Sequence, residues 1–89
     1  MLKPRQLEHR VKGFASHRRI QIMELLERSP GLSLMEIADK LKMNLKTTSV
    51  HSQRLAATGL ISKSVKSNVT KHNLTRRGLA ILSFLRNME

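Results

Sequence analysis

Cysteine and aromatic residues are the first things this sequence lacks, and both absences limit its chemistry. The chain has no cysteine, which excludes disulfides, thiolate zinc sites and cysteine nucleophiles. Its only aromatic residues are Phe14 and Phe84, too few for the stacking platforms that bind single-stranded nucleic acid or RNA. The longest apolar run, Leu79–Leu82, is far too short to cross a bilayer, and the N-terminus lacks the apolar segment of a secretory signal. We therefore expect a cytoplasmic protein.

Acidic residues are almost missing from the second half of the chain. From residue 40 onward the sequence carries ten Lys or Arg and a single acid, Glu89, whereas residues 20–39 carry four acids and one base. The net charge of the whole chain is +11. A basic region with so little acid to offset it is typical of proteins that bind polyanions, most often nucleic acid. Because duplex DNA binders need no aromatic platforms, the composition favours double-stranded DNA as the partner.

Hydrophobic spacing predicts a first helix over residues 16–28, ended by Ser29-Pro30-Gly31. The apolar residues that recur at helical spacing are Ile20, Ile22, Met23, Leu25 and Leu26. Residues 1–14 are weakly periodic, and we predict an N-terminal helix or arm there. The chain, at 89 residues, is expected to form one domain over residues 1–89 whose small core would benefit from a partner subunit.

Two further helices are predicted on either side of a tight connection. Ser33 and Glu36 have the spacing of a capping box, which indicates a helix over 33–42. Asn44 is a good N-cap and Gly59 a good C-cap, so the next helix is expected over 44–58. That helix is rich in Lys, Thr, Ser and Gln, and Thr and Ser are mediocre helix formers. Such a helix is stabilised by its packing on the rest of the protein, or its residues are selected for the partner that its surface binds.

The hydrophobic period then changes from helical to alternating. Residues 61–74 read as a β-hairpin with a turn at Lys66-Ser67-Asn68, and Thr75 is expected to cap a last helix over 75–88. This last helix is apolar around most of its circumference, so one face can pack on the domain while another needs a second surface. The predicted fold class is mainly α with a small β-hairpin (α+β).

The order of these elements and four short motifs resemble a winged helix-turn-helix regulator. Residues 14–26, Phe-Ala-Ser-His-Arg-Arg-Ile-Gln-Ile-Met-Glu-Leu-Leu, resemble the opening of the arsenic-repressor-like (ArsR) family, and residues 34–41 are similar to its positioning helix. Thr58-Gly59-Leu60-Ile61 resembles the helix-to-wing junction, and Leu74-Thr75-Arg-Arg-Gly78 is similar to the post-wing motif of the multiple-antibiotic-resistance (MarR) family. The resemblance implies a helix-turn-helix, a basic wing and terminal helices that form a dimer.

The sequence departs from these families at three kinds of position. Thr48 and Ser52 stand where the recognition helix usually carries apolar residues, which predicts looser packing of that helix. Val50 replaces a frequent DNA-contacting Arg and could contact a thymine methyl group instead. The positioning helix lacks the cysteines of the ArsR metal sensors, and no two of the four histidines are spaced as a metal pair. We expect no metal, no cofactor and no enzymatic activity.

The candidate DNA-binding residues lie on the predicted recognition helix, the turn before it and the wing. The first turns of such a helix reach base edges, whereas residues further along and on the wing reach phosphates. We assign base edges to Lys46, Thr47, Ser49 and Val50, and phosphate contacts to Gln53 and Arg54. The remaining candidates are Lys42 and Asn44 at the turn and Lys63, Lys66 and Lys71 on the wing. The alternatives are a solvated polar helix face and an edge hairpin kept soluble by lysines.

Three functions remain open from the sequence. The first is a nucleoid-associated transcriptional regulator, a homodimer on a palindromic operator, whose interface is assigned to Leu7, Val11, Phe14, Leu82 and Leu85. The alternative to this dimer is a monomer in which the N-terminal segment folds over the last helix of the same chain. The second function is a DNA architectural or accessory protein with weak sequence specificity. The third is a winged helix that binds protein or RNA. Four arginines near helix starts are interpreted either as phosphate contacts or as plain surface charges: Arg18, Arg19, Arg76 and Arg77. His51, on the predicted recognition helix, is expected to be half-buried.

Overall fold

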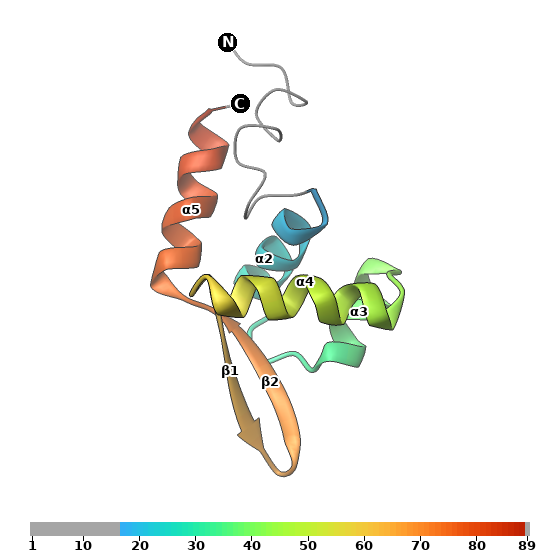
Figure 1. Ribbon diagram of the computed structural model, residues 1–89. Helices are drawn as coiled ribbons and strands as arrows, with labels where there is room; N and C mark the ends of the chain where they lie inside the picture. Colours follow the sequence, from blue (N-terminus) through green and yellow to red (C-terminus); the bar gives the residue numbers. More distant parts are fainter. Residues whose placement is uncertain (1–16, 89) are drawn as a thin grey trace.

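A computed structural model of the chain describes residues 17–88, and Figure 1 shows their arrangement. In chain order the elements are α2 (His17–Arg28), α3 (Leu34–Leu41), α4 (Leu45–Ala57), β1 (Ile61–Lys66), β2 (Val69–Leu74) and α5 (Arg76–Asn87). The predicted α+β class, with helices and one small hairpin, is confirmed. The helix or arm predicted over residues 1–14 lies outside the described residues. None of the helices within residues 17–88 has the length and hydropathy that a membrane crossing requires.

Local capping sets the bounds of the helix-turn-helix pair, α3 and α4. The predicted capping box is present: the Glu36 amide donates to Ser33 Oγ at 3.2 Å and the Ser33 amide to Glu36 Oε1 at 2.9 Å. Lys42 ends α3 in the left-handed conformation, with φ 52°. Asn44 then starts α4, because its Oδ1 accepts from the amides of Lys46 and Thr47 at 2.8 and 3.3 Å. The connection is tight because both ends of the turn are capped within three residues.

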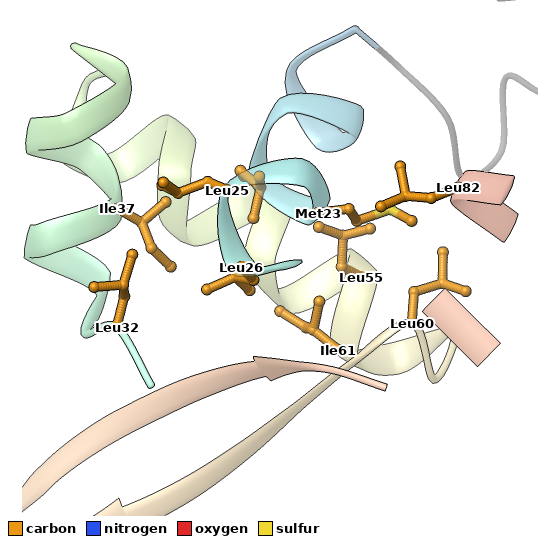
Figure 2. Close-up of a cluster of buried hydrophobic side chains, with 10 residues drawn as sticks. Met23, Leu25, Leu26, Leu32, Ile37, Leu55, Leu60, Ile61 and Leu82 are labelled. Atoms are coloured by element: carbon orange, nitrogen blue, oxygen red, sulfur yellow. The ribbon is translucent and has the colours of Figure 1, made fainter. Parts of the chain in front are cut away.

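The hydrophobic core gathers around α2, as Figure 2 shows. This helix contributes Ile22, Met23, Leu25 and Leu26, and it contacts α3, α4, α5 and β2. The other buried members come one each from α3, α4, β1 and α5, and one each from the loops before α3 and β1. These are Leu32, Ile37, Leu55, Leu60, Ile61 and Leu82. Because the core has few members, α4 is held in place by few side chains. Leu55 is the only large apolar side chain of α4 that is fully buried.

The hairpin is antiparallel, and its root is joined to the loop before α3. The register runs from Ile61 opposite Leu74 to Lys66 opposite Val69, closed by a two-residue turn. At the root, the amide of His72 and its Nδ1 both donate to the Leu32 carbonyl oxygen at 2.8 Å, while the Gly31 amide donates to the His72 carbonyl at 3.0 Å. The buried His72 ring therefore fixes the wing to the helical core, a role the sequence did not reveal.

The post-wing motif, residues 74–78, packs closely at the junction of α4, the hairpin and α5. Thr75 Oγ1 accepts from the Gly78 amide at 3.0 Å as the N-cap of α5 and lies 2.7 Å from the Gly59 carbonyl oxygen, to which it donates. A Cβ on Gly78 would fall 2.6 Å from Leu74 Cδ1 and even closer to the Leu60 carbonyl oxygen. Gly78 is therefore required for close approach, and Gly59 for its φ of +77°.

The side of α5 that faces the core differs from the sequence-based assignment. Leu82 and Leu85 are 1% and 4% exposed within the single chain, and Leu82 belongs to the core cluster. The chain's own packing therefore covers these two side chains, and their assignment to a dimer interface stays a prediction. The exposed apolar side chains of α5 are Leu79 at 46% and Phe84 at 53%. A helix that is apolar around most of its circumference does not reveal by periodicity which side meets the core.

The far end of α5 is joined to α2 by charge. Arg86 donates to both carboxylate oxygens of Glu27, at 2.7 and 3.3 Å, and lies 3.6 Å from Glu24. The hydrogen bonds from Arg86 lower the pKa of Glu27 below its ordinary value, and the same bonds raise the pKa of Arg86. Two of the four acids in the described residues are therefore engaged by α5 and do not offset the basic surface of α4 and the hairpin.

Candidate nucleic-acid interface

Helix α4 presents its polar residues on one side and packs on the core with the other. Its buried residues are Thr48, Ser52 and Leu55, spaced at i, i+4 and i+7. The predicted contact residues fall between them, with Ser49 half-buried and Lys46, Thr47, Val50, Gln53 and Arg54 exposed. Lys42 and Asn44 are exposed in the turn before the helix, where the Asn44 side chain is already engaged as the N-cap. The structure thus brings the helix candidates onto one accessible face.

Two residues of that face are already held together. Gln53 Nε2 donates to Ser49 Oγ at 3.2 Å, one helical turn apart. This bond leaves the Ser49 hydroxyl hydrogen, the second N–H of Gln53 and the Gln53 carbonyl oxygen available, so the pair offers two donors and an acceptor in a fixed arrangement. A bond of this kind restricts the rotamers of both side chains before any ligand arrives, which reduces the entropy lost on binding.

The inner face of α4 carries two hydroxyls where a core-facing helix normally carries apolar groups. Thr48 Oγ1 donates to the Asn44 carbonyl oxygen at 2.8 Å, within the same helix. Ser52 is fully buried, and its Oγ has no hydrogen-bond partner within the described part of the chain. The first two turns of α4, which hold most of the contact residues, are therefore packed on the core through hydroxyls rather than through large apolar side chains.

A cationic cluster joins the start of α2 to the middle of α4. Arg19 is buried, and its Nε donates to Nδ1 of the half-buried His51 at 3.4 Å. Burial, followed by the charges of Arg19, Arg54 and Arg18, lowers the pKa of His51 below its ordinary value. Since Nδ1 accepts from Arg19, the neutral ring carries its proton on Nε2. His51 is half-buried as predicted, but the reading of Arg19 as a surface charge or phosphate clamp was wrong.

The three wing lysines do not form a single row. Cross-strand partners share a face, so Lys63 lies on the side of Val65, Thr70 and His72, whereas Lys66 and Lys71 lie on the opposite side with Val69. Lys63 and Lys66 are exposed, and Lys71 is half-buried. Hydrogen bonds with Ser33, with a smaller effect of the Lys71 charge, lower the pKa of Glu36 below its ordinary value.

Acidic side chains are confined to one part of the described structure. Glu24 and Glu27 lie on α2, and Glu36 and Asp39 on α3, whereas α4, both strands and α5 carry no acid. Among residues 17–88, no group of three His, Asp or Glu side chains is arranged to hold a metal ion. The exposed residues of α4 and the hairpin therefore include bases and small polar groups and no acid, together with exposed apolar side chains at Leu45, Val50, Val65 and Val69. The bases can neutralise phosphates.

A tight turn between α3 and α4, an exposed polar face on the second of these helices and a basic hairpin behind it define a helix-turn-helix with a wing. A family model described as winged helix-turn-helix DNA-binding matches residues 16–62. The chain belongs to this family. The match covers α2, the helix-turn-helix pair and the first residues of the wing.

Solved structures with the same fold come from MarR-family and related bacterial proteins. The YusO protein of Bacillus subtilis is 19% identical, with a TM-score of 0.82, over 91% of this chain and 60% of that one. A MarR family protein from Bacillus stearothermophilus is 17% identical, with a TM-score of 0.81, over 94% and 59%. FabT of Streptococcus pneumoniae, solved in complex with DNA, is 17% identical, with a TM-score of 0.74, over 83% and 54%.

These identities establish a shared fold. The chain spans 54% to 60% of the length of these three structures. No curated protein matches the chain by sequence.

Proposed function

We propose that this chain is a sequence-specific, double-stranded DNA-binding transcriptional regulator, with α4 in the major groove and the wing on the backbone and minor groove. The observation that carries the proposal is the acid-free surface of α4 and the hairpin, on which bases and small polar groups are exposed, while the acids among residues 17–88 all lie on α2 or α3. The fold is shared with FabT, which was solved in complex with DNA. We propose no catalytic activity, no cofactor, and a nucleoid-associated place in the cytoplasm.

Individual contacts follow from position on α4. Lys46, Thr47, Ser49 and Val50 are assigned to base edges, because the first turns of a recognition helix enter the groove most deeply. Gln53 and Arg54, further along, are assigned to phosphate or to the edge of the groove. Lys42 and Asn44 before the helix, and Lys63, Lys66 and Lys71 on the wing, are assigned to the backbone, where contacts give grip without sequence information.

Within the winged-helix family, the structural neighbours favour a MarR-like rather than an ArsR-like chain. The structure from Bacillus stearothermophilus is described as a MarR family protein, and the post-wing motif that resembles that family forms the packed junction around Thr75 and Gly78. The ArsR-like opening at residues 14–26 remains a sequence resemblance.

We also propose a homodimer, with a revised interface on α5. Leu79 and Phe84 replace Leu82 and Leu85 as the apolar contacts, because they are the exposed ones. Leu7, Val11 and Phe14 remain candidates from the sequence and lie outside the described residues. A two-fold pair would place two copies of α4 ~34–36 Å apart, one turn of duplex, and would read a palindrome.

Selection from a random duplex library tests the function directly. We expect one enriched, palindromic sequence, whose identity changes with Lys46→Ala or Ser49→Ala. Lys66→Ala should weaken all duplexes similarly and reduce the salt slope by ~1. If Lys66→Ala changed the enriched core sequence while Lys46→Ala did not, the assignment of reading and gripping elements would be reversed. Equal affinity for all duplexes would instead support an architectural protein, and no affinity at low salt would support a protein or RNA interaction module.

A further inference from the structure

The methionine in the turn between α3 and α4 has a reactive sulfur that the proposed contacts do not use. This sequence has no cysteine, so its methionines carry all of its sulfur. Within residues 17–88, Met23 is buried, Met88 is half-buried and Met35 is 72% exposed. Met43 is half-buried and packs against the core cluster. Together with Met35 it lines an open cavity between α3 and the start of α4, so part of its side chain stays within reach of small solutes.

Backbone geometry gives Met43 a fixed place in this turn. Its amide donates to the Ala38 carbonyl oxygen at 2.9 Å, and the Lys42 amide donates to the Asp39 carbonyl oxygen at 3.2 Å. With Lys42 in the left-handed conformation, these two bonds form a Schellman motif. In this motif an apolar side chain at the position of Met43 packs back on the helix near Ala38. Both residues line the same cavity, as that packing requires.

The start of α4 depends on this side chain more than the rest of the helix does. Figure 1 shows that the start lies beside α3, at the opposite end from the junction of α4 with the hairpin. The fully buried Leu55 lies near the junction end, whereas the earlier turns are packed through the hydroxyls of Thr48 and Ser52. Met43 packs on the core and comes directly before the N-cap, Asn44. It therefore holds the end of α4 that carries the residues proposed to read bases.

We propose that Met43 is an oxidation site through which peroxide-type oxidants weaken DNA binding by α4. This inference rests on the proposed function and adds a modification site to it. The thioether sulfur attacks one oxygen of hydrogen peroxide, the O–O bond breaks, and a sulfur–oxygen bond forms. The sulfur loses two electrons, the peroxide is reduced, and both of its protons leave with the second oxygen as water. The product, methionine sulfoxide, is polar where the thioether was apolar.

The sulfoxide does not keep the packing of the thioether. Holding a polar group against the apolar core costs free energy, so the oxidised side chain turns towards solvent. The turn then loses its apolar contact, and DNA binding must first restore the order of the start of α4. We expect oxidation of Met43 to weaken binding of the enriched duplex roughly tenfold and to lower the melting temperature by ~4–8 °C. Oxidation of Met35 should have neither effect, because that side chain is largely in water.

Hydrogen peroxide treatment of the full chain tests this assignment. Peptide mass spectrometry gives the sulfoxide fraction at each methionine, and the dissociation constant for the enriched duplex is measured on the same sample. Met43→Leu keeps the volume and apolar character, so it should bind like the wild type before treatment and keep its affinity afterwards. Met35→Leu is the matched control and should lose affinity as the wild type does. Methionine sulfoxide reductases should restore the affinity of the oxidised wild type.

A second pair of variants needs no oxidant. Met43→Gln places a polar group of similar length at the same position, and it should weaken binding and lower the melting temperature as the sulfoxide does. Met35→Gln should change neither. The substitutions and the oxidation all leave the charge unaltered, so the salt slope should equal that of the wild type.

A wild type that binds unchanged once Met43 is converted to the sulfoxide would overturn the inference and leave the proposed function standing. So would a Met43 that stays reduced while Met35 is oxidised, or a Met43→Leu variant that loses affinity on oxidation as the wild type does. A reduced wild type that enriches no duplex would overturn the proposed function itself. The melting temperatures of the Met43 variants would then still test the role of this side chain in the turn.

Discussion

Ser52 offers a direct test of how α4 is held. Its hydroxyl is fully buried on the inner face of the helix, and its Oγ has no hydrogen-bond partner among residues 17–88. An unsatisfied buried polar group costs ~1–3 kcal/mol of stability. We therefore expect Ser52→Ala to stabilise the protein, in contrast to most substitutions of buried residues.

The expected magnitude combines three terms. Removing the unpaired hydroxyl recovers ~1–3 kcal/mol, and alanine adds up to ~0.7 kcal/mol of helix propensity over serine. The void left by one oxygen atom is smaller than a methyl group and costs less than ~1 kcal/mol. The net expectation is a gain of about 1 to 2 kcal/mol. For a domain of this size, 1 kcal/mol raises the melting temperature by ~4–8 °C.

Urea and thermal denaturation measure this gain, with Ser83→Ala as the matched control. Ser83 is an exposed serine in the middle of α5, so its replacement reports helix propensity without burial. Because both substitutions gain the same helix propensity, Ser52→Ala should exceed Ser83→Ala by about 1 kcal/mol, the recovered hydroxyl cost less the void. Equal effects, or a loss of stability for Ser52→Ala, would refute the reasoning, because the hydroxyl would then be satisfied in solution.

Three further outcomes are expected. Gly78→Ala should destabilise the protein by about 2 kcal/mol in urea denaturation, because overpacking against the Leu60 carbonyl outweighs the ~1 kcal/mol of helix propensity gained; unchanged stability would mean that α5 can move away freely. Since the folded-state pKa of His51 lies below its unfolded value of 6.5, the unfolded state binds the proton first, and stability should fall as the pH drops through about 6.5. His51→Gln should remove that part of the pH dependence, and parallel wild-type and variant curves would contradict it. Phe84→Asp should reduce the sedimenting mass to that of a 10.2 kDa monomer without unfolding it, whereas Leu82→Ala should cost ~2–5 kcal/mol of stability; a mass unaffected by Phe84→Asp would exclude this face as the interface.

The sequence predicted the features that depend on neighbours along the chain. The capping box at Ser33, the N-caps at Asn44 and Thr75 and the left-handed Gly59, which directly follows the C-cap of α4, are local signals, and they were sufficient to define the order of the elements. The exposed face of α4 also followed from local spacing.

Features that depend on distant contacts were missed or wrong. Arg19 looked like a surface charge, because its contact with His51 joins residues 32 positions apart. His72 looked like an ordinary strand residue, although its ring bonds to a carbonyl 40 positions earlier. The burial of Leu82 and Leu85 within the single chain was not foreseen, because the packing of α2 on α5 decides which apolar side of α5 is buried. The division of the wing lysines between two faces needed the strand register, which a single sequence does not specify.

The central claim is that α4 reads a particular sequence within double-stranded DNA, and its sharpest test compares two affinities. The dissociation constant for the enriched duplex and for a shuffled duplex of equal composition should be measured at the same salt concentration. We predict that the enriched duplex binds ~10³-fold or more tightly, and that raising the salt from ~50 to ~200 mM weakens both by orders of magnitude. Equal affinities at every salt concentration would contradict the claim, because the basic face would then grip DNA without reading it.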